Sequence, residues 1–210
     1  MKLKKIASLM LAGVMAISML AGCSGEKETE ENNQVAPTTN IATYANSLLS
    51  ASQKAVFEFK SSTELDEALK AVATDSTKFT SSDIKTNVGN KSVSWNADLK
   101  AELEKKLDVD FEADSYFQNS TANGKDKYNA YVCVLSTVYD ENGAVKTAVD
   151  KIKGDALNGG TYFPVTNTGY TLDYTAEISA VKVTAPDNSK DSVWVVAFLY
   201  TQTATKAANV

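Results

Sequence analysis

Two runs in the second half of the chain are apolar on both of their alternating faces. The first spans residues 128–139 and is rich in Tyr and Val, and the second is VWVVAFLYT at residues 193–201. Successive side chains of a strand point to opposite faces, so a run that is apolar at nearly every position has to be covered from both sides. These runs therefore predict two long strands that are buried on both faces.

A third strand is predicted just before the second of these runs. Residues 172–184 alternate apolar and polar side chains, which is the pattern of a strand with one covered face. The alternation shifts phase at Val181 and Val183, as a β-bulge would allow. Residues 186–191 form a polar connection, so we expect the last two strands to pair as an antiparallel hairpin.

Three segments in the first half of the chain have helical spacing of apolar residues. The first spans Ile41–Val56, the second opens with Thr63–Asp66, which resembles a capping box, and the third follows Asn96 as its N-cap. The apolar stripe of the second helix is Leu65, Ala68, Leu69 and Val72, and that of the third helix is Leu99, Leu103 and Leu107. The third helix is also predicted to carry two i,i+4 ion pairs, Lys100–Glu104 and Glu102–Lys106.

Two further stretches are less regular. Residues 74–96 are rich in Ser, Thr, Asn and Lys and are predicted to be mostly loop, with a short strand at Lys91–Trp95. After the turn at 140–143, Asn142-Gly143 suggests a hairpin, whereas the apolar residues of 145–157 keep helical spacing. We favour a helix at 144–157.

Helices that precede long strands predict an α+β fold, in which N-terminal helices pack on one side of an antiparallel sheet built by the C-terminal half. Residues 41–210 contain no second linker and no repeat, so we expect one globular domain there. Such a fold hosts many unrelated functions and by itself supports no functional statement.

The first 23 residues have the pattern of an export signal. Lys2, Lys4 and Lys5 precede an apolar run that is shorter than the roughly 20 residues needed to span a bilayer, and the run ends in Leu20-Ala21-Gly22-Cys23. This stretch resembles the lipobox signal of bacterial lipoproteins. The resemblance implies that residues 1–22 are a signal peptide cleaved before Cys23, and that the Cys23 thiol carries a diacylglyceryl group.

The same resemblance implies a protein held by its lipid on the outer face of a bacterial membrane. Two or three acyl chains anchor a protein stably, whereas one chain binds only marginally. Residues 24–40 are polar and acidic, so residues 23–40 are predicted to be a lipidated cysteine followed by a disordered tether.

Composition excludes several classes of chemistry. The whole chain has a net charge of −5, and without residues 1–22 the balance is 18 lysines against 26 acidic residues, or −8, which argues against nucleic acid as a partner. The chain has no histidine, and all 21 basic residues are lysine, so histidine-dependent triads are excluded. Cys133 is the one cysteine beyond Cys23, and its place between two valines predicts a buried, inert thiol.

One acidic run is a candidate metal site. Asp108, Asp110, Glu112 and Asp114 stand at alternate positions, as do the first oxygen ligands of a calcium-binding EF-hand. The EF-hand pattern then fails, because Ala113 stands where glycine is needed and Asn119 where a glutamate is needed. We favour a half-buried strand with the acids in water, and keep a calcium site of another type as the alternative. No other cofactor is expected.

The loop 159–170 is a candidate ligand-binding site. It combines aromatic rings with amide and hydroxyl groups, which is what a sugar or an extended peptide needs, and its candidate residues are Tyr162, Phe163, Asn167 and Tyr170. Glycine, proline and asparagine are also ordinary turn residues, and the rings can equally cover a sheet edge.

Three functions are compatible with these sequence features. The first is a non-catalytic lipoprotein that binds a glycan or protein ligand of the cell envelope or its surroundings. The second is an envelope glycan hydrolase that uses paired Asp or Glu residues, and the third is a structural subunit of an envelope complex. We favour the first.

Overall fold

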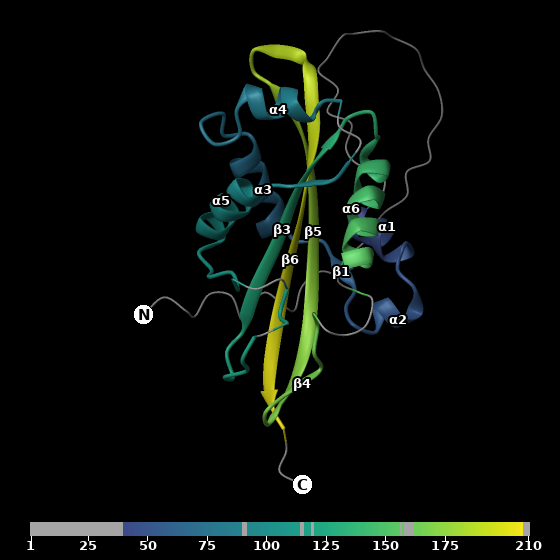
Figure 1. Ribbon diagram of the computed structural model, residues 1–210, viewed down its shortest axis with the longest axis vertical. Helices are drawn as coiled ribbons and strands as arrows, with labels where there is room; N and C mark the ends of the chain where they lie inside the picture. The colour runs from purple at the N-terminus through teal and green to yellow at the C-terminus, as the bar shows by residue number, and fades with distance from the viewer. Residues whose placement is uncertain are drawn as a thin grey trace, which may run out of the picture. The chain divides into compact units, whose positions relative to one another are not determined.

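A mixed sheet forms the centre of the structure, with the long strands side by side in its middle (Figure 1). The computed structural model describes residues 40–89, 92–113, 116–118, 120–155, 157 and 162–207. In spatial order the strands are β1 (Phe59–Lys60), β5 (Tyr170–Ala185), β6 (Asn188–Lys206), β3 (Lys127–Ser136) and β2 (Ser94–Trp95), and β4 (Thr166–Asn167) pairs with β5. The two doubly apolar runs thus form long central strands, as predicted, although β3 ends at Ser136, three residues before the end of its predicted run. The structure also places the two strands side by side.

The sheet is not purely antiparallel. β1 pairs with β5 in parallel, through Phe59↔Ala176 and Lys60↔Glu177, whereas every other pairing of named strands is antiparallel. The predicted antiparallel sheet is therefore corrected to a mixed one. β1 is only two residues long, and such a short strand has no periodicity to read in the sequence.

The hairpin of β5 and β6 is confirmed, but the bulge predicted near Val181 is wrong. Val181↔Val195 and Val183↔Val193 keep the same register as the rest of the pair, and the irregularity lies between Thr184 and Ala185. The sequence changes phase because the covered face changes along the strand: Ile178 packs into one core, whereas Val181 and Val183 pack into the other.

The described helices are interleaved with the strands along the chain. They are α1 (Ile41–Ser47), α2 (Ala51–Lys54), α3 (Thr63–Ala73), α4 (Ser81–Asn87), α5 (Ala97–Leu107) and α6 (Glu141–Asp155). The predicted order of N-terminal helices followed by strands is therefore wrong in detail, because α6 follows β3. The α+β class itself is confirmed, and so is the helix favoured at 144–157.

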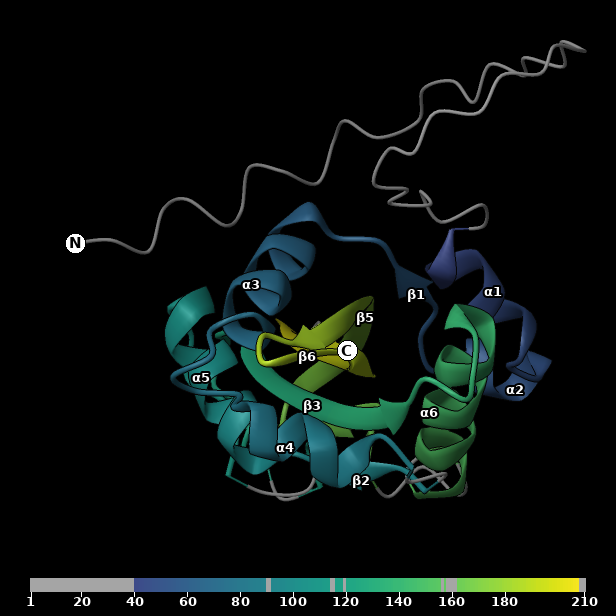
Figure 2. The ribbon, with the colours of Figure 1, turned by 90° about the horizontal axis from the view of Figure 1, so that it is seen from above.

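Helices cover both faces of the sheet and not one. In Figure 2, α3, α4 and α5 lie on one side and α1, α2 and α6 on the other. The first core, between the sheet and α1 and α6, contains Ala45, Val149 and Phe198; the second core, between the sheet and α3 and α5, contains Leu69 and Leu103. The predicted helical cover on one side of the sheet is therefore wrong, because strands that are apolar on both faces need cover on both sides.

Capping side chains set where several helices begin. Asn96 accepts the Leu99 N–H (2.8 Å) and caps α5 as predicted, whereas α3 is capped by Ser62, one residue before the predicted start. The helix predicted over Ile41–Val56 is interrupted, because Ser50 starts α2 with a capping box of its own. Within the described part of the chain, no helix has both the length and the apolar character to cross a bilayer.

The charged face of α5 is arranged differently from its predicted i,i+4 pairs. Glu102 pairs with Lys105 (2.7 Å) and with Lys78 (3.4 Å). Lys100 donates to Asn129 Oδ1 at 2.7 Å, and burial lowers the pKa of its ammonium group. One i,i+3 pair within the helix and contacts to neighbouring segments thus stand in place of the predicted i,i+4 pairs.

Candidate functional site

The outer edge of β5 is only partly covered. β1 pairs with Ala176 and Glu177 and then ends, and among the described residues no strand pairs with this side of 178–185. An unpaired strand edge presents a row of backbone N–H and C=O groups that can bind another extended chain. This edge is therefore the first feature of a candidate site.

Asn46 shows which backbone groups face the open edge. Its amide accepts the Phe59 N–H (2.7 Å) and donates to the Phe59 carbonyl (2.8 Å), so both backbone groups of Phe59 point away from β5. Because backbone direction alternates along a strand, β1 meets β5 through Lys60 and through even-numbered residues of β5. The next even-numbered residues, Ala180 and Lys182, therefore direct their N–H and C=O groups to the open edge.

A cleft of about 410 Å³ lies along this edge. Ser179, Ala180 and Val181 of β5 form its floor. One wall comes from α3 and the other from the first residues of α1 and α6, and the wall residues are Asn40, Ile41, Ser61, Asp66, Lys70 and Glu141. The cleft thus combines a backbone edge with two carboxylates and one ammonium group.

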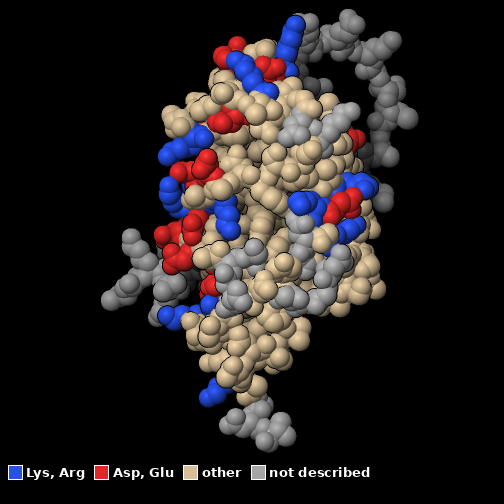
Figure 3. All heavy atoms as spheres, in the orientation of Figure 1, with Lys and Arg blue, Asp and Glu red and all other residues tan. Residues whose placement is uncertain are grey.

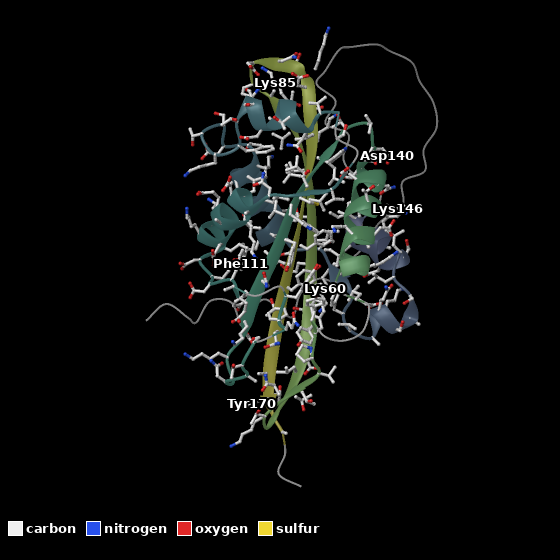
Figure 4. All side chains as sticks on the ribbon, in the orientation of Figure 1. Lys60, Lys85, Phe111, Asp140, Lys146 and Tyr170 are labelled. Carbon is white, nitrogen blue, oxygen red and sulfur yellow. The ribbon has the colours of Figure 1, made fainter. Side chains whose placement is uncertain are left out.

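Two polar side chains of the cleft are wholly or partly buried. Ser179 is 2% exposed and lies on the floor of the cleft. Glu141 is half-buried at the start of α6 and makes no ion pair or hydrogen bond there. Burial, and then the neighbouring charge of Asp140, raises the pKa of the Glu141 carboxyl. Figure 4 labels Asp140 at the upper end of α6. A ligand that supplies a positive charge beside Glu141 would favour the charged form of this carboxyl.

Other side chains of the cleft already have structural roles. Asn40 caps α1 by accepting the Ala42 N–H (2.9 Å), and it also accepts the hydroxyl of Ser61 (2.9 Å). This second bond joins the start of α1 to the segment that follows β1. Two lining residues of the cleft are therefore bonded to each other.

A second, smaller pocket of about 280 Å³ lies between α3 and α5. Three of its charged lining residues pair with one another, since Glu102 contacts both Lys78 and Lys105. Figure 3 shows this interspersed pattern of lysines and acids over α3 and α5 and again over α6, where Asp150 pairs with Lys146 and Lys153. Charges that are already paired offer less to a ligand, so we prefer the cleft beside β5.

The aromatic residues predicted as a ligand site lie in and beside the first core. Phe163 is 3% exposed, and its ring centre is 5.1 Å from those of both Phe57 and Tyr174. Tyr162 is half-buried and packs 5.4 Å from Tyr116. Phe163 therefore belongs to the first core, and Tyr162 packs against it.

The other two residues of that prediction lie near the far end of the β5–β6 hairpin. Asn167 donates to the Ser120 carbonyl at 2.8 Å, and Asn167 and Tyr170 pair across β4 and β5. Figure 4 labels Tyr170 at the lower end of the hairpin. Ligand binding at Tyr162, Phe163, Asn167 and Tyr170 stays a prediction, and none of these residues lines the cleft beside β5.

The acidic run follows the end of α5. Asp108 ends that helix in the left-handed conformation (φ 55°), Glu112 pairs with Lys127 (3.0 Å), and Phe111 forms a single bridge to Tyr128. Asp114 lies outside the described residues. Among the residues that are described, no three metal-ligating side chains gather closely enough to hold an ion. A calcium site that includes Asp114 stays a prediction.

Of the two cysteines, Cys133 lies within the described residues. Cys133 is fully buried in β3, and burial raises the pKa of its thiol far above the usual range. A thiol in that state is neutral and unreactive, in agreement with its sequence context. Cys23 and the rest of the predicted signal and tether up to residue 39 lie outside the described residues.

Ser179 and Glu141 were missed as site residues by reasoning from the sequence. Ser179 occupies an ordinary polar position of an alternating strand, and Glu141 stands in a turn-like sequence before α6. No local signal distinguishes them, because the open edge beside them exists only where β1 stops pairing with β5. That pairing joins residues more than 100 positions apart in the sequence.

Comparison of the chain with family models, with curated proteins and with solved structures found no match.

Proposed function

We propose that the protein is an exported, lipid-anchored module that binds a ligand of the bacterial cell envelope or its surroundings in the cleft beside β5. The export signal and the lipobox at Leu20–Cys23 support the address. The observation that carries the binding proposal is the cleft itself, in which an open strand edge lies beside the half-buried carboxylate of Glu141. An open strand edge can pair with another extended chain, and a carboxylate that burial disfavours gains from a ligand cation, so both features support a binding role.

Replacement of the lipobox cysteine tests the address. In cells, the wild-type protein is expected in the membrane fraction with a lipid-modified N-terminus at Cys23, as mass spectrometry would detect. Cys23→Ser should abolish the modification and the cleavage before residue 23, whereas Cys133→Ser should leave both unchanged. A wild-type chain that retains residues 1–22 without lipid would refute the lipoprotein proposal.

Thermal unfolding of the mature protein, extracted in detergent, tests binding. The panel contains envelope glycans, extended peptides and calcium, each at a high concentration. A ligand at 100 times its dissociation constant adds about 2.7 kcal/mol, which shifts the midpoint by about 5–10 °C for a domain of this size. Ligand binding in the cleft predicts a shift that shrinks in Glu141→Gln and persists in Glu67→Gln, an exposed residue of α3 outside the cleft.

A further inference from the structure

We propose that the ligand of this cleft is an extended peptide segment that carries a lysine or arginine side chain and that binds as an added strand along Ala180 and Lys182 of β5. This inference rests on the proposed function and specifies its ligand class. Three observations lead to it: the direction of the backbone groups, the recessed position of the edge, and the charge of the walls.

The backbone supplies the first part of the argument. β1 already pairs with β5 up to Glu177, and the open edge continues in the same line from Ile178 onward. A chain that enters the cleft can therefore extend the sheet where β1 stops, with its own N–H and C=O groups opposite those of Ala180 and Lys182. Strand addition of this kind binds through main-chain hydrogen bonds, and side-chain pockets then supply specificity.

The position of the edge favours a single extended chain over a second copy of the protein. The floor of the cleft lies between α3 on one side and α1 and α6 on the other, as Figure 2 also shows for the helices around β5. If two copies approached edge to edge, their own flanking helices would meet before the two β5 strands came within pairing distance, which is about 4.8 Å. An isolated peptide has no such helices.

The charge of the walls selects a cationic side chain. Asp66, Glu141 and the neighbouring Asp140 contribute three negative charges. Two positive charges stand against them, those of Lys70 on α3 and Lys182 on β5, which are both exposed. A ligand cation near Glu141 would offset both the burial and the repulsion that this carboxylate experiences. The hydroxyl of Ser179, on the floor, can donate to or accept from the same ligand.

Peptides of matched sequence test the charge preference. The probes are amidated octapeptides of alternating Thr and Val with either Lys or Glu at one central position and the same fluorophore on each N-terminus. Their binding to the mature protein in detergent is followed by fluorescence anisotropy. The lysine peptide should bind at least tenfold more tightly than the glutamate peptide. Glu141→Gln should reduce that ratio several-fold, and Glu67→Gln should leave it unchanged. Equal affinity of the two peptides for the wild type would overturn the proposal.

N-methylated peptides test strand addition without any change in the protein. Only alternate residues of an added strand direct their N–H groups to β5, so methylation of alternate amides in one set should abolish binding, and methylation of the other set should preserve it. Ala180→Pro removes an edge donor without touching the β5–β6 ladder, and should abolish binding while the unfolding midpoint stays near that of the wild type. Equal binding of both methylated sets would exclude strand addition.

The outcomes separate this inference from the proposed function. If no peptide binds but an envelope glycan shifts the unfolding midpoint through Glu141, the cleft is a binding site and the peptide inference is wrong. If nothing in the panel shifts the midpoint, the proposed function itself fails. A dimer that Ala180→Pro converts to a monomer would assign the edge to a second copy and would also overturn the inference.

Discussion

Two tyrosine hydroxyl groups in and beside the first core differ in their hydrogen bonding. The Tyr174 hydroxyl donates to the Pro164 carbonyl (2.6 Å) and accepts from Gln202 (3.0 Å). The Tyr200 hydroxyl is buried and has no hydrogen-bond partner among the described residues. An unsatisfied buried donor costs free energy, whereas a satisfied one contributes modestly.

Replacement of each tyrosine by phenylalanine should therefore have opposite effects. Tyr200→Phe removes an unsatisfied group and should raise the free energy of unfolding by about 1 kcal/mol. Tyr174→Phe removes two hydrogen bonds and should lower it by about 1–2 kcal/mol. Urea unfolding of the two variants measures the difference, and a loss of stability in Tyr200→Phe would show that its hydroxyl is satisfied.

Glu177 gives a pH-dependent prediction. Burial raises the pKa of its carboxyl above the value of about 4.3 expected in the unfolded chain. The folded state therefore favours the protonated form, and stability falls as the pH rises from the unfolded to the folded pKa. Glu177→Gln should be more stable than the wild type at pH 7 and equal to it near pH 3. A constant difference across this range, measured by thermal unfolding, would contradict the assignment.

At the scale of elements, β1 depends on a side chain from another segment. Its two residues pair with β5 on one side, and the Asn46 amide takes both backbone groups of Phe59 on the other. The amide thus does for β1 what a further strand would do, and it closes the sheet at this edge. The cleft begins where β1 ends, so Asn46 also helps to define the site.

Asn46→Ala should lower the free energy of unfolding by about 2 kcal/mol, because it leaves the N–H and C=O of Phe59 without partners. Asn87→Ala is the matched control, since Asn87 makes one hydrogen bond to Asp83 within its own helix and should cost less than about 1 kcal/mol. Chemical denaturation measures both variants. Similar small losses would show that water satisfies Phe59 equally well.

Elements with strong periodicity were predictable, and those that depend on distant partners were not. The runs of β3 and β6, the stripe of α5 and the helical spacing of α6 all carry their burial pattern in the local sequence. α4 was missed because only Ile84 is buried in it, although the Thr80–Asp83 capping box was present as a signal. The parallel pairing of β1 arises from contacts more than 100 residues apart and leaves no local pattern.

At the scale of the whole molecule, the site follows from a mismatch in strand length. β5 and β6 are 16 and 19 residues long, whereas β1 covers only two residues of the β5 edge. Helices on both faces cover apolar side chains of β5 such as Ile178 and Val183 but leave its backbone edge open between them. A long strand with a short neighbour thus creates a recessed edge, and a recessed edge suits an extended ligand.

Backbone amide hydrogen exchange of the mature protein, without ligand, tests this account most directly. The N–H groups of Ala180 and Lys182 face the open edge, whereas those of Val181 and Val183 face β6. We expect the first pair to exchange at least about 100-fold faster than the second, because only the second pair is protected by the ladder. Slow exchange at all four amides in a monomeric protein would show that the edge is already covered, and would contradict the central claim that this edge is open for binding.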